Sequence, residues 1–268
     1  MSFYTSLSGL KNAQTELNTI AHNLANSETN GYKKSRVEFA DIVASSAFSN
    51  PKMVQGIGST VEAISQNFSI GPVEQTGSSL DAAISGEGFF SVKSATTGET
   101  MFTRNGSFTT DENGYIHDGS GNRLQIFAPG VDPASGTTVD AQILATNAGG
   151  AGFTGLTISE QGVVTASYAD GSNTVVGNVA LASFISPAGL KQVGSSNWQA
   201  TGLSGQPTYG TPGQGSFGEL LSGALERSNV DIAEELVSLI TAQRYFQANA
   251  KAIDTATQIS QTVINLRS

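Results

Sequence analysis

The side chains that most often carry chemistry are few in this sequence, and their spacing does not suit a metal site. Two histidines occur, His22 inside a helical pattern and His117 beside a turn, and neither belongs to an HxxxH or HExxH pair. The absence of cysteine excludes disulfides, thiolate metal ligands and cysteine nucleophiles. We therefore expect both histidines to be structural, and we predict no metal site.

An acidic turn between residues 111 and 118 resembles part of a calcium-binding loop. Asp111, Asn113 and Asp118 could supply oxygen ligands, but Gly114 falls at the wrong place and no glutamate closes the loop. A turn accounts for these residues better than a calcium site does.

Two further patterns can be explained without catalysis. Gly86-Glu87-Gly88 follows a predicted strand, but the third glycine and the helix of a phosphate-binding loop are missing. Glu234 and Glu235 begin a helical pattern, where carboxylates favour the positive end of the helix dipole. The GxSxG and GxxxxGK[ST] motifs are absent as well. We predict no catalytic residue and no cofactor, and we expect that the chain is not an enzyme.

Helical patterns with a seven-residue period lie near both ends of the sequence, from Phe3 to Asn26 and within Glu219–Ser268. Their main apolar rows contain the residues that we name the assembly seam: Leu10, Leu17, Leu24, Leu239, Phe246 and Ile253. Ala13 and Ile20 widen the first apolar face. Second rows accompany the seam, at Leu7, Gln14 and Ala21 in the first pattern and at Leu236, Gln243, Ala250, Thr257 and Ile264 in the second.

Two such narrow apolar rows need to be covered. Terminal segments fray unless they are tied down. We therefore expect the terminal helices to pair with each other, with copies in other subunits, or both. An ordinary amphipathic helix lying on a core is the alternative for each pattern taken alone.

Between about residues 56 and 202 the apolar pattern changes to a period of two, with turn residues between short runs. Asn113-Gly114 is a strong hairpin signal, and no helical pattern interrupts the runs. The sequence predicts an α+β fold, with an antiparallel β body inserted between N- and C-terminal helices that pair as a coiled coil. The expected parts are a terminal helix with its following segment (1–36), a connector (37–55), a β domain (56–202), a Gly/Pro linker (203–218) and a C-terminal helix (219–268).

The charge balance excludes several partners. The net charge is −9 with 13 Lys and Arg, whereas nucleic acids and anionic membrane surfaces attract clustered cations. No run approaches the ~18 apolar residues of a membrane span. We expect no nucleic-acid partner and no membrane insertion. The N-terminus lacks the pattern of a secretory signal, so we expect any export to avoid a cleaved Sec signal.

One short segment, residues 31–36, is basic. It is either a solvated turn or an intersubunit contact for acidic neighbours such as Glu28 or Asp41.

Three stretches resemble the signature motifs of bacterial flagellar rod and hook proteins, in the order expected for that family. They are Asn23–Lys33 near the N-terminus, Ser78–Phe90 followed by Phe102–Phe108 in the middle, and Gly223–Tyr245 near the C-terminus. The residues that we name the signature residues are Asn23, Asn26, Gly31, Tyr32, Asp81, Gly86, Gly88, Phe89, Asn229, Val230, Gln243 and Arg244.

The resemblance implies a structural subunit of the bacterial flagellum, located in the hook or the basal-body rod after export through the flagellar type III apparatus. It also implies a homo-oligomer in which identical subunits stack as a helical tube, with paired terminal helices lining the tube and rod, hook or junction proteins adjoining it. Residues 1–10, 223–226 and 263–267 resemble the hook protein, so a hook subunit is expected. The overall length and residues 156–207 resemble the distal rod protein, which is the alternative.

Two other classes of protein remain open. A secreted β-rich enzyme or carbohydrate-binding domain would need a concave site with converging aromatic or carboxylate side chains, and Trp198 is the single tryptophan. An adaptor or cap could instead bind an axial tube without being part of it.

Overall fold

The computed structural model describes residues 2–44, 55–133 and 136–265, and two compact units are present. Unit 1 is drawn from residues 1–27, 34–67 and 230–268, and unit 2 from residues 28–33 and 68–229. Among the described residues, no helix combines the length and the apolar character that crossing a membrane requires.

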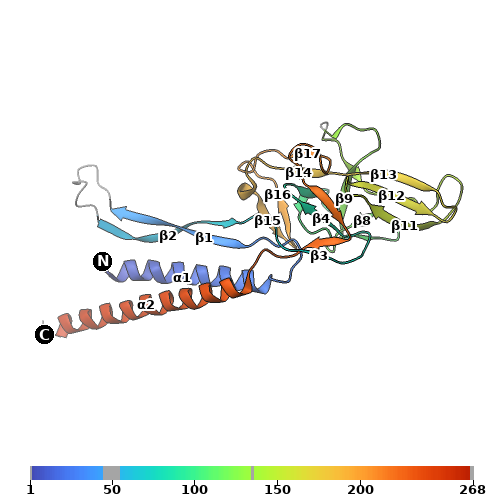
Figure 1. The fold of residues 1–268 in the computed structure, drawn as a ribbon. Helices are drawn as coiled ribbons and strands as arrows, with labels where there is room; N and C mark the ends of the chain where they lie inside the picture. The colour runs from blue at the N-terminus through green and yellow to red at the C-terminus, as the bar shows by residue number, and fades with distance from the viewer. Residues whose placement is uncertain (1, 45–54, 134–135, 266–268) are drawn as a thin grey trace. The chain divides into compact units, whose positions relative to one another are not determined.

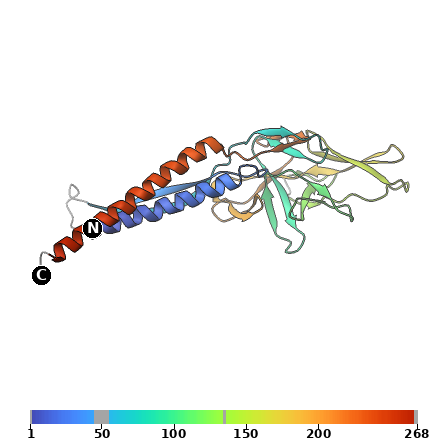
Figure 2. The ribbon, with the colours of Figure 1, turned by 90° about the horizontal axis from the view of Figure 1, so that it is seen from below.

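Unit 1 contains two helices that lie side by side (Figures 1 and 2), α1 (Ser2–Ala25) and α2 (Ile232–Asn265). They run antiparallel, because Asn23 near the end of α1 hydrogen-bonds Glu235 near the start of α2, while Gly9 lies against Asn249. Asp231 caps α2, since its carboxylate accepts hydrogen bonds from the N–H groups of Ala233 (2.8 Å) and Glu234 (3.2 Å).

A long antiparallel hairpin completes unit 1. Its strands are β1 (Ser35–Ala44) and β2 (Gln55–Gln66), and Ser35 lies opposite Gln66. The hairpin contacts α1, where Asn12 Nδ2 donates to Ser59 Oγ at 2.8 Å.

The connector predicted at residues 37–55 is wrong over its described part, because residues 37–44 belong to β1 and residue 55 to β2. Residues 45–54 lie outside the described residues. The physical reason is two shifts of register, at Glu38/Phe39 and at Ile42/Val43, which interrupt the alternation of side chains in β1. The predicted start of the β domain also changes, since β2 belongs to unit 1.

Unit 2 is a β body in which every pair of named strands described here is antiparallel. Among the described residues, thirteen strands form one sheet with a main path β11-β12-β13-β9-β5-β6-β16-β15. Along this path the strands are β11 (Phe153–Ile158), β12 (Val163–Tyr168), β13 (Asn173–Val179), β9 (Asn122–Phe127), β5 (Phe89–Ser94), β6 (Thr100–Thr103), β16 (Asn197–Gln199) and β15 (Lys191–Gly194). The strands beside the path are β7 (Thr109–Thr110), β8 (Ile116–His117), β10 (Val139–Asp140), β14 (Leu181–Ser183) and β17 (Thr208–Gly210), and a short 3-10 helix, η3, spans Pro187–Gly189.

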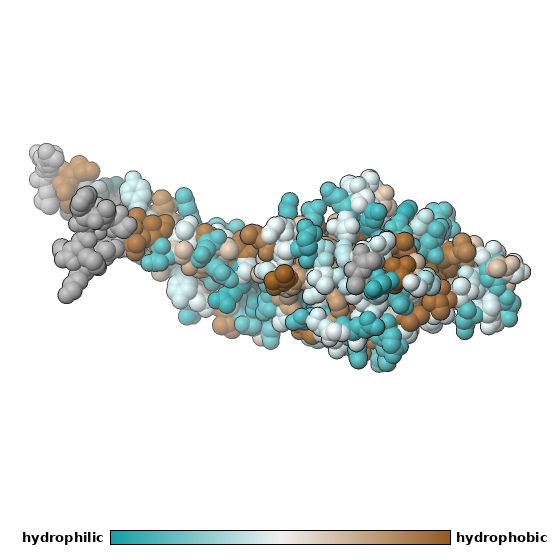
Figure 3. All heavy atoms as spheres, turned by 90° about the horizontal axis from the view of Figure 1, so that it is seen from above, coloured by the Kyte–Doolittle hydropathy of each residue, from teal (hydrophilic) through white to brown (hydrophobic). Residues whose placement is uncertain are grey.

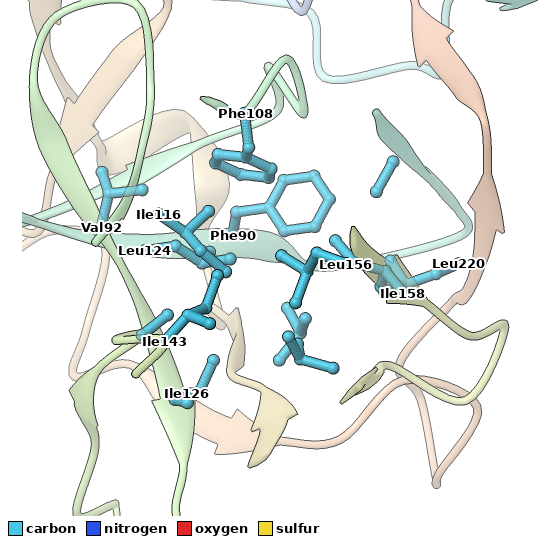
Figure 4. Close-up of a cluster of buried hydrophobic side chains, with 14 of the residues drawn as sticks. Phe90, Val92, Phe108, Ile116, Leu124, Ile126, Ile143, Leu156, Ile158 and Leu220 are labelled. Carbon is cyan, nitrogen blue, oxygen red and sulfur yellow. The ribbon is translucent and has the colours of Figure 1, made fainter. Parts of the chain in front are cut away.

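Two apolar clusters form the core of unit 2. The larger one includes Phe90, Leu124 and Leu156 and is shown in Figure 4. The smaller one surrounds Trp198, whose ring lies 5.9 Å from that of Phe89. The alternating runs of the sequence supply these residues from many short strands, so the predicted antiparallel β body is confirmed.

Two more predicted boundaries differ. The linker at 203–218 contains part of the β body, because β17 pairs with β14. The first residues of the predicted C-terminal helix form β18 (Glu219–Ser222), which pairs with β4 (Ala82–Ser85), and β19 (Ala224–Glu226), which pairs with β3 (Val73–Gln75). Burial of Leu220 and Leu225 favours these strands, and Gly223 between them has a positive φ of 71°.

Candidate functional site

The six residues of the assembly seam are all partly buried in unit 1, where α1 contacts both α2 and the hairpin. The most buried apolar side chains of the two helices are those of Ala13, Ile20 and Ala242.

The predicted second rows are partly wrong, because Leu7 and Ala250 are partly buried but the other members are exposed. Gln14, Ala21, Leu236 and Gln243 are exposed, and the residue just before each of them is buried instead. One residue corresponds to a rotation of about 100° around a helix axis. On α1 the buried positions are Ala13 and Ile20, which the sequence placed on the widened apolar face. On α2 the count of apolar residues could not select the buried face, because its buried positions are Glu235 and Ala242.

A second apolar face of α2 remains exposed within unit 1. Its large residues include Val237, Ile240, Tyr245, Ile259 and Val263. Figure 3, drawn from the side opposite to that of Figure 2, shows hydrophobic residues in brown at several places on the surface. Packing inside one chain therefore covers only part of the apolar surface of this helix.

Polar groups fix the register of the helix pair near Asn23. The Asn23 amide exchanges hydrogen bonds with the backbone of Ser35, at 2.8 and 2.9 Å, and also donates to Glu235 Oε2 at 3.2 Å. Lys34 Nζ lies 2.8 Å from Glu235 Oε1 and 3.2 Å from Glu234 Oε2. Partial burial opposes the charge of Lys34, but the bonds to Glu235 and Glu234 prevail and raise its pKa. These contacts hold the start of the hairpin on the helix pair.

Unit 2 contains a buried charged cluster that we name the signature junction: Lys33, Arg104 and Glu226. Lys33 Nζ forms an ion pair with Glu226 Oε1 and donates to the carbonyl of Ser69 at 2.7 Å. Arg104 Nη1 lies 3.5 Å from Glu226 Oε2. Three segments that are far apart in the sequence therefore meet at one carboxylate.

Other groups complete the surroundings of this carboxylate. The N–H of Gly71 donates to Glu226 Oε1 at 2.9 Å, and Arg104 Nη2 donates to the carbonyl of Gly86 at 3.0 Å. The guanidinium of Arg104 also lies 5.1 Å from the ring centre of Phe89. Burial lowers the pKa of Lys33, and attraction to Glu226 only partly opposes this effect.

The backbone conformation and close surroundings of Gly31 explain why this position requires a glycine. Its φ is 66°, its N–H donates to the carbonyl of Glu226 at 2.8 Å, and an added Cβ would lie 2.5 Å from the backbone nitrogen of Asn105. Any side chain here would be strained and would push the two segments apart. Arg227 reinforces the same contact, because its Nη1 donates to Asn30 Oδ1 at 3.1 Å.

The signature residues fall into three groups. Gly31, Gly86, Gly88, Phe89 and Asn229 lie in the segments of unit 2 that form or flank the signature junction, and Asn229 Nδ2 donates to the carbonyl of Ser69 at 3.2 Å. Tyr32 is buried, and Asp81 accepts a hydrogen bond from Thr76 Oγ1. The unit 1 group includes Asn26, whose Nδ2 donates to the carbonyl of His22 at 2.8 Å, together with Asn23, Val230, Gln243 and Arg244; the last two are exposed.

The solvated-turn interpretation of the basic segment 31–36 is wrong for its lysines. Lys33 is buried against Glu226, and Lys34 pairs with Glu234 and Glu235. The sequence missed Lys33, Arg104 and Glu226 as a site. The one feature of the sequence that these three residues share is that each lies inside one of the three signature motifs.

The acidic turn and His117 have structural roles. Asp111 Oδ1 accepts hydrogen bonds from the N–H groups of Asn113 and Tyr115, and Asp118 Oδ1 accepts those of Ser120 and Asn122. Nδ1 of His117 lies 2.8 Å from the carbonyl of Asp118. Throughout the described part of the chain, no group of three or more His, Asp or Glu residues could hold a metal ion.

Three family models match this chain, in an order that follows the three signature motifs. They are described as flagella basal body rod protein (residues 3–33), flagellar hook protein FlgE/F/G D1 domain (residues 83–166) and flagellar basal body rod FlgEFG protein C-terminal (residues 221–266).

Similar proteins span the whole chain. The flagellar basal-body rod protein FlgG of Bacillus subtilis is 35% identical over 279 positions, covering 99% of this chain and 98% of the relative. FlgG of Borreliella burgdorferi is 33% identical with the same coverage. The flagellar hook protein FlgE of Salmonella typhimurium is 28% identical over 411 positions, with full coverage of both chains.

Proposed function

This chain belongs to the family of bacterial flagellar rod and hook proteins, and from that membership we propose that it is a subunit of the distal rod of the flagellar basal body. The observation that carries the proposal is length. The alignment with the Bacillus FlgG spans 279 positions for the 268 residues of this chain, whereas the alignment with the Salmonella hook protein spans 411. At least 143 hook positions (411 minus 268) therefore have no counterpart here.

A hook subunit is the second candidate. Residues 1–10 and 263–267 favoured it in the sequence, and the hook relative aligns over its full length. The higher identity and near-equal length of the FlgG relatives favour the rod instead. A hook must bend as it transmits torque, whereas a distal rod is a stiff drive shaft.

Assembly is the activity that we infer for this chain. The antiparallel contact of α1 with α2 supports a paired-helix core, and we infer that it behaves as a coiled coil in the assembled tube. The exposed face of α2 is available for copies of the same chain. Heterologous contacts that do not close on themselves generate such a helical tube. Export through the flagellar type III apparatus and contacts with adjoining rod, hook and junction proteins complete the proposal.

Electron microscopy of basal bodies from a strain that lacks this gene tests the proposal. A distal-rod subunit predicts basal bodies in which the rod ends early, with neither distal rod nor hook, and restoration when the chain is supplied from a plasmid. Complete rods that lack hooks would overturn the proposal and identify a hook subunit.

A further inference from the structure

A surface groove of about 340 Å³ lies in unit 2 between the turn after β7, residues 143–145 and the start of β11. Its lining includes Asp111, Glu112, Ile143, Leu144 and Phe153. The lining therefore combines an acidic wall, formed by Asp111 and Glu112, with large apolar side chains.

The apolar part of the groove is held in place by the fold. Ile143 is buried, and its N–H donates to the carbonyl of Gly114 at 2.7 Å. The hydroxyl of Tyr168 donates to the carbonyl of Leu144 at 3.2 Å, and the rings of Tyr168 and Phe153 are 6.4 Å apart. Even so, the side chain of Leu144 is 67% exposed and that of Phe153 is 37% exposed. Two large apolar side chains are thus exposed to solvent on a backbone that the fold holds in place. Binding of a partner to them would cost little backbone entropy.

The charge of unit 2 indicates which kind of partner can bind over Leu144 and Phe153. Residues 28–33 and 68–229 contain 14 Asp and Glu but 6 Lys and Arg, which leaves −8 of the total charge of −9 in this unit. Glu112 is exposed and forms no ion pair within the described ranges. The nearby cation Arg123 pairs with Asp140 at 2.9 Å, lies over the ring of Tyr115 and also attracts Asp111. Glu112 is therefore the carboxylate of this wall that is left to attract a cation from outside.

We propose that this groove binds an extended segment of another protein that carries a lysine or arginine next to a large apolar side chain. The apolar residue packs on Leu144 and Phe153, while the cation meets Glu112 and Asp111. Lysine and arginine suit such a site because their aliphatic stems cover apolar surface while their charged ends stay in water. The groove is independent of the helices that we assign to assembly, so this inference does not rest on the proposed function.

Binding of a labelled peptide tests the inference on the full chain. The probe is a fluorescein-labelled, end-blocked peptide of alternating lysine and leucine, which places the two kinds of side chain on opposite faces when extended. Two matched peptides replace leucine with serine or lysine with glutamate. Fluorescence anisotropy should show binding of the first peptide and at least tenfold weaker binding of the other two.

Variants inside the groove, each with a matched control elsewhere on unit 2, test whether the peptide binds in the groove. Glu112→Lys and Leu144→Ser should each weaken binding about tenfold or more. Glu99→Lys and Leu203→Ser make the same changes at exposed positions outside the groove lining and should change it less than twofold. Absence of binding, equal binding of the serine peptide, or equal loss in Glu99→Lys would overturn the inference. Self-association of the wild-type chain that Glu112→Lys and Leu144→Ser abolish, measured by analytical ultracentrifugation, would overturn it too, because the occupant would then be a second copy.

Discussion

At the scale of single residues, the signature junction depends on one carboxylate. Glu226 faces Lys33 and Arg104 in a buried site, so two cations share this carboxylate. Removing one partner of a buried ion pair leaves an uncompensated charge, and such a change costs about 3–5 kcal/mol. We predict that Glu226→Gln lowers the free energy of unfolding of unit 2 by that amount. Urea denaturation followed by the fluorescence of the buried Trp198 measures it.

Glu74→Gln is the matched control for this prediction. Glu74 also pairs with an arginine, Arg227, but its side chain is 57% exposed. Exposed pairs contribute about 0–1 kcal/mol, so the control should unfold nearly like the wild type. Equal stabilities for the two variants would contradict a structural role of the junction.

Two consecutive lysines should respond to pH in opposite directions. Lys33 has a lowered pKa, so the unfolded chain binds its proton more tightly than the folded chain does, and its contribution to stability rises as the pH increases towards about 10.4. Lys34 has a raised pKa, so its contribution is complete below about 10.4 and disappears as the pH passes its folded pKa.

Denaturation of the wild type, Lys33→Met and Lys34→Met across the alkaline range would separate the two effects. As the pH rises, the stability advantage of the wild type over Lys33→Met should grow. The advantage of the wild type over Lys34→Met should shrink. Parallel curves would refute the assignment of opposite environments to the two residues.

The junction also marks a limit of reasoning from sequence. The residues of its two ion pairs are 193 and 122 positions apart along the chain, and no local period connects positions so distant. The basic segment 31–36 suggested only solvated or intersubunit lysines, because burial of a lysine depends on a partner that the rest of the fold delivers. Gly31 was recognised as a signature residue, but the sequence did not reveal that the backbone of Asn105 excludes a side chain at this position.

At the scale of elements, the helix pair has a face that can be tested directly. Phe246 is partly buried, whereas Gln243 is exposed, although both stood in rows predicted for one apolar stripe. We predict that Phe246→Asp lowers the helical circular dichroism of the monomer and prevents tube assembly, because a carboxylate would enter the contact between helices. Near-ultraviolet signals of Trp198, which lies in unit 2, should persist.

Gln243→Asp introduces the same carboxylate three residues away. In the monomer it should leave the helical signal unchanged, since that position faces solvent. A comparable loss of helicity in both variants would show that α2 packs by a different face.

Elements were predictable where one physical signal dominated. The seven-residue period located both helices, and alternation with turns located the β body. Strand β1 was not predicted, because its two register shifts break the alternation of apolar and polar residues that identifies a strand. Strands β18 and β19 were not predicted, because their apolar residues precede the helical pattern directly and were counted as part of the helix. The true boundaries are the turn at Gly223 and the N-cap at Asp231.

At the scale of the whole molecule, charge is distributed unequally between the two units. Unit 2 carries a net charge of −8 and unit 1 carries −1, from 8 acidic and 7 basic residues. In the proposed tube, copies would therefore repel each other mainly through unit 2, while the helices of unit 1 would contribute apolar attraction with little net charge. The balance between these effects depends on ionic strength, because salt screens repulsion between exposed charges and leaves apolar burial in place.

From this imbalance we predict that assembly of the purified chain becomes easier as salt is added. The screening length falls from about 30 Å at 0.01 M to about 8 Å at 0.15 M, so the lowest protein concentration that yields sedimentable tubes should fall over this range. The double variant Glu99→Gln and Glu160→Gln, altered at two exposed positions of unit 2, should assemble at lower salt than the wild type. If salt instead dissolves the tubes, ion pairs between copies outweigh the repulsion of unit 2, and attraction between opposite charges holds the subunits together.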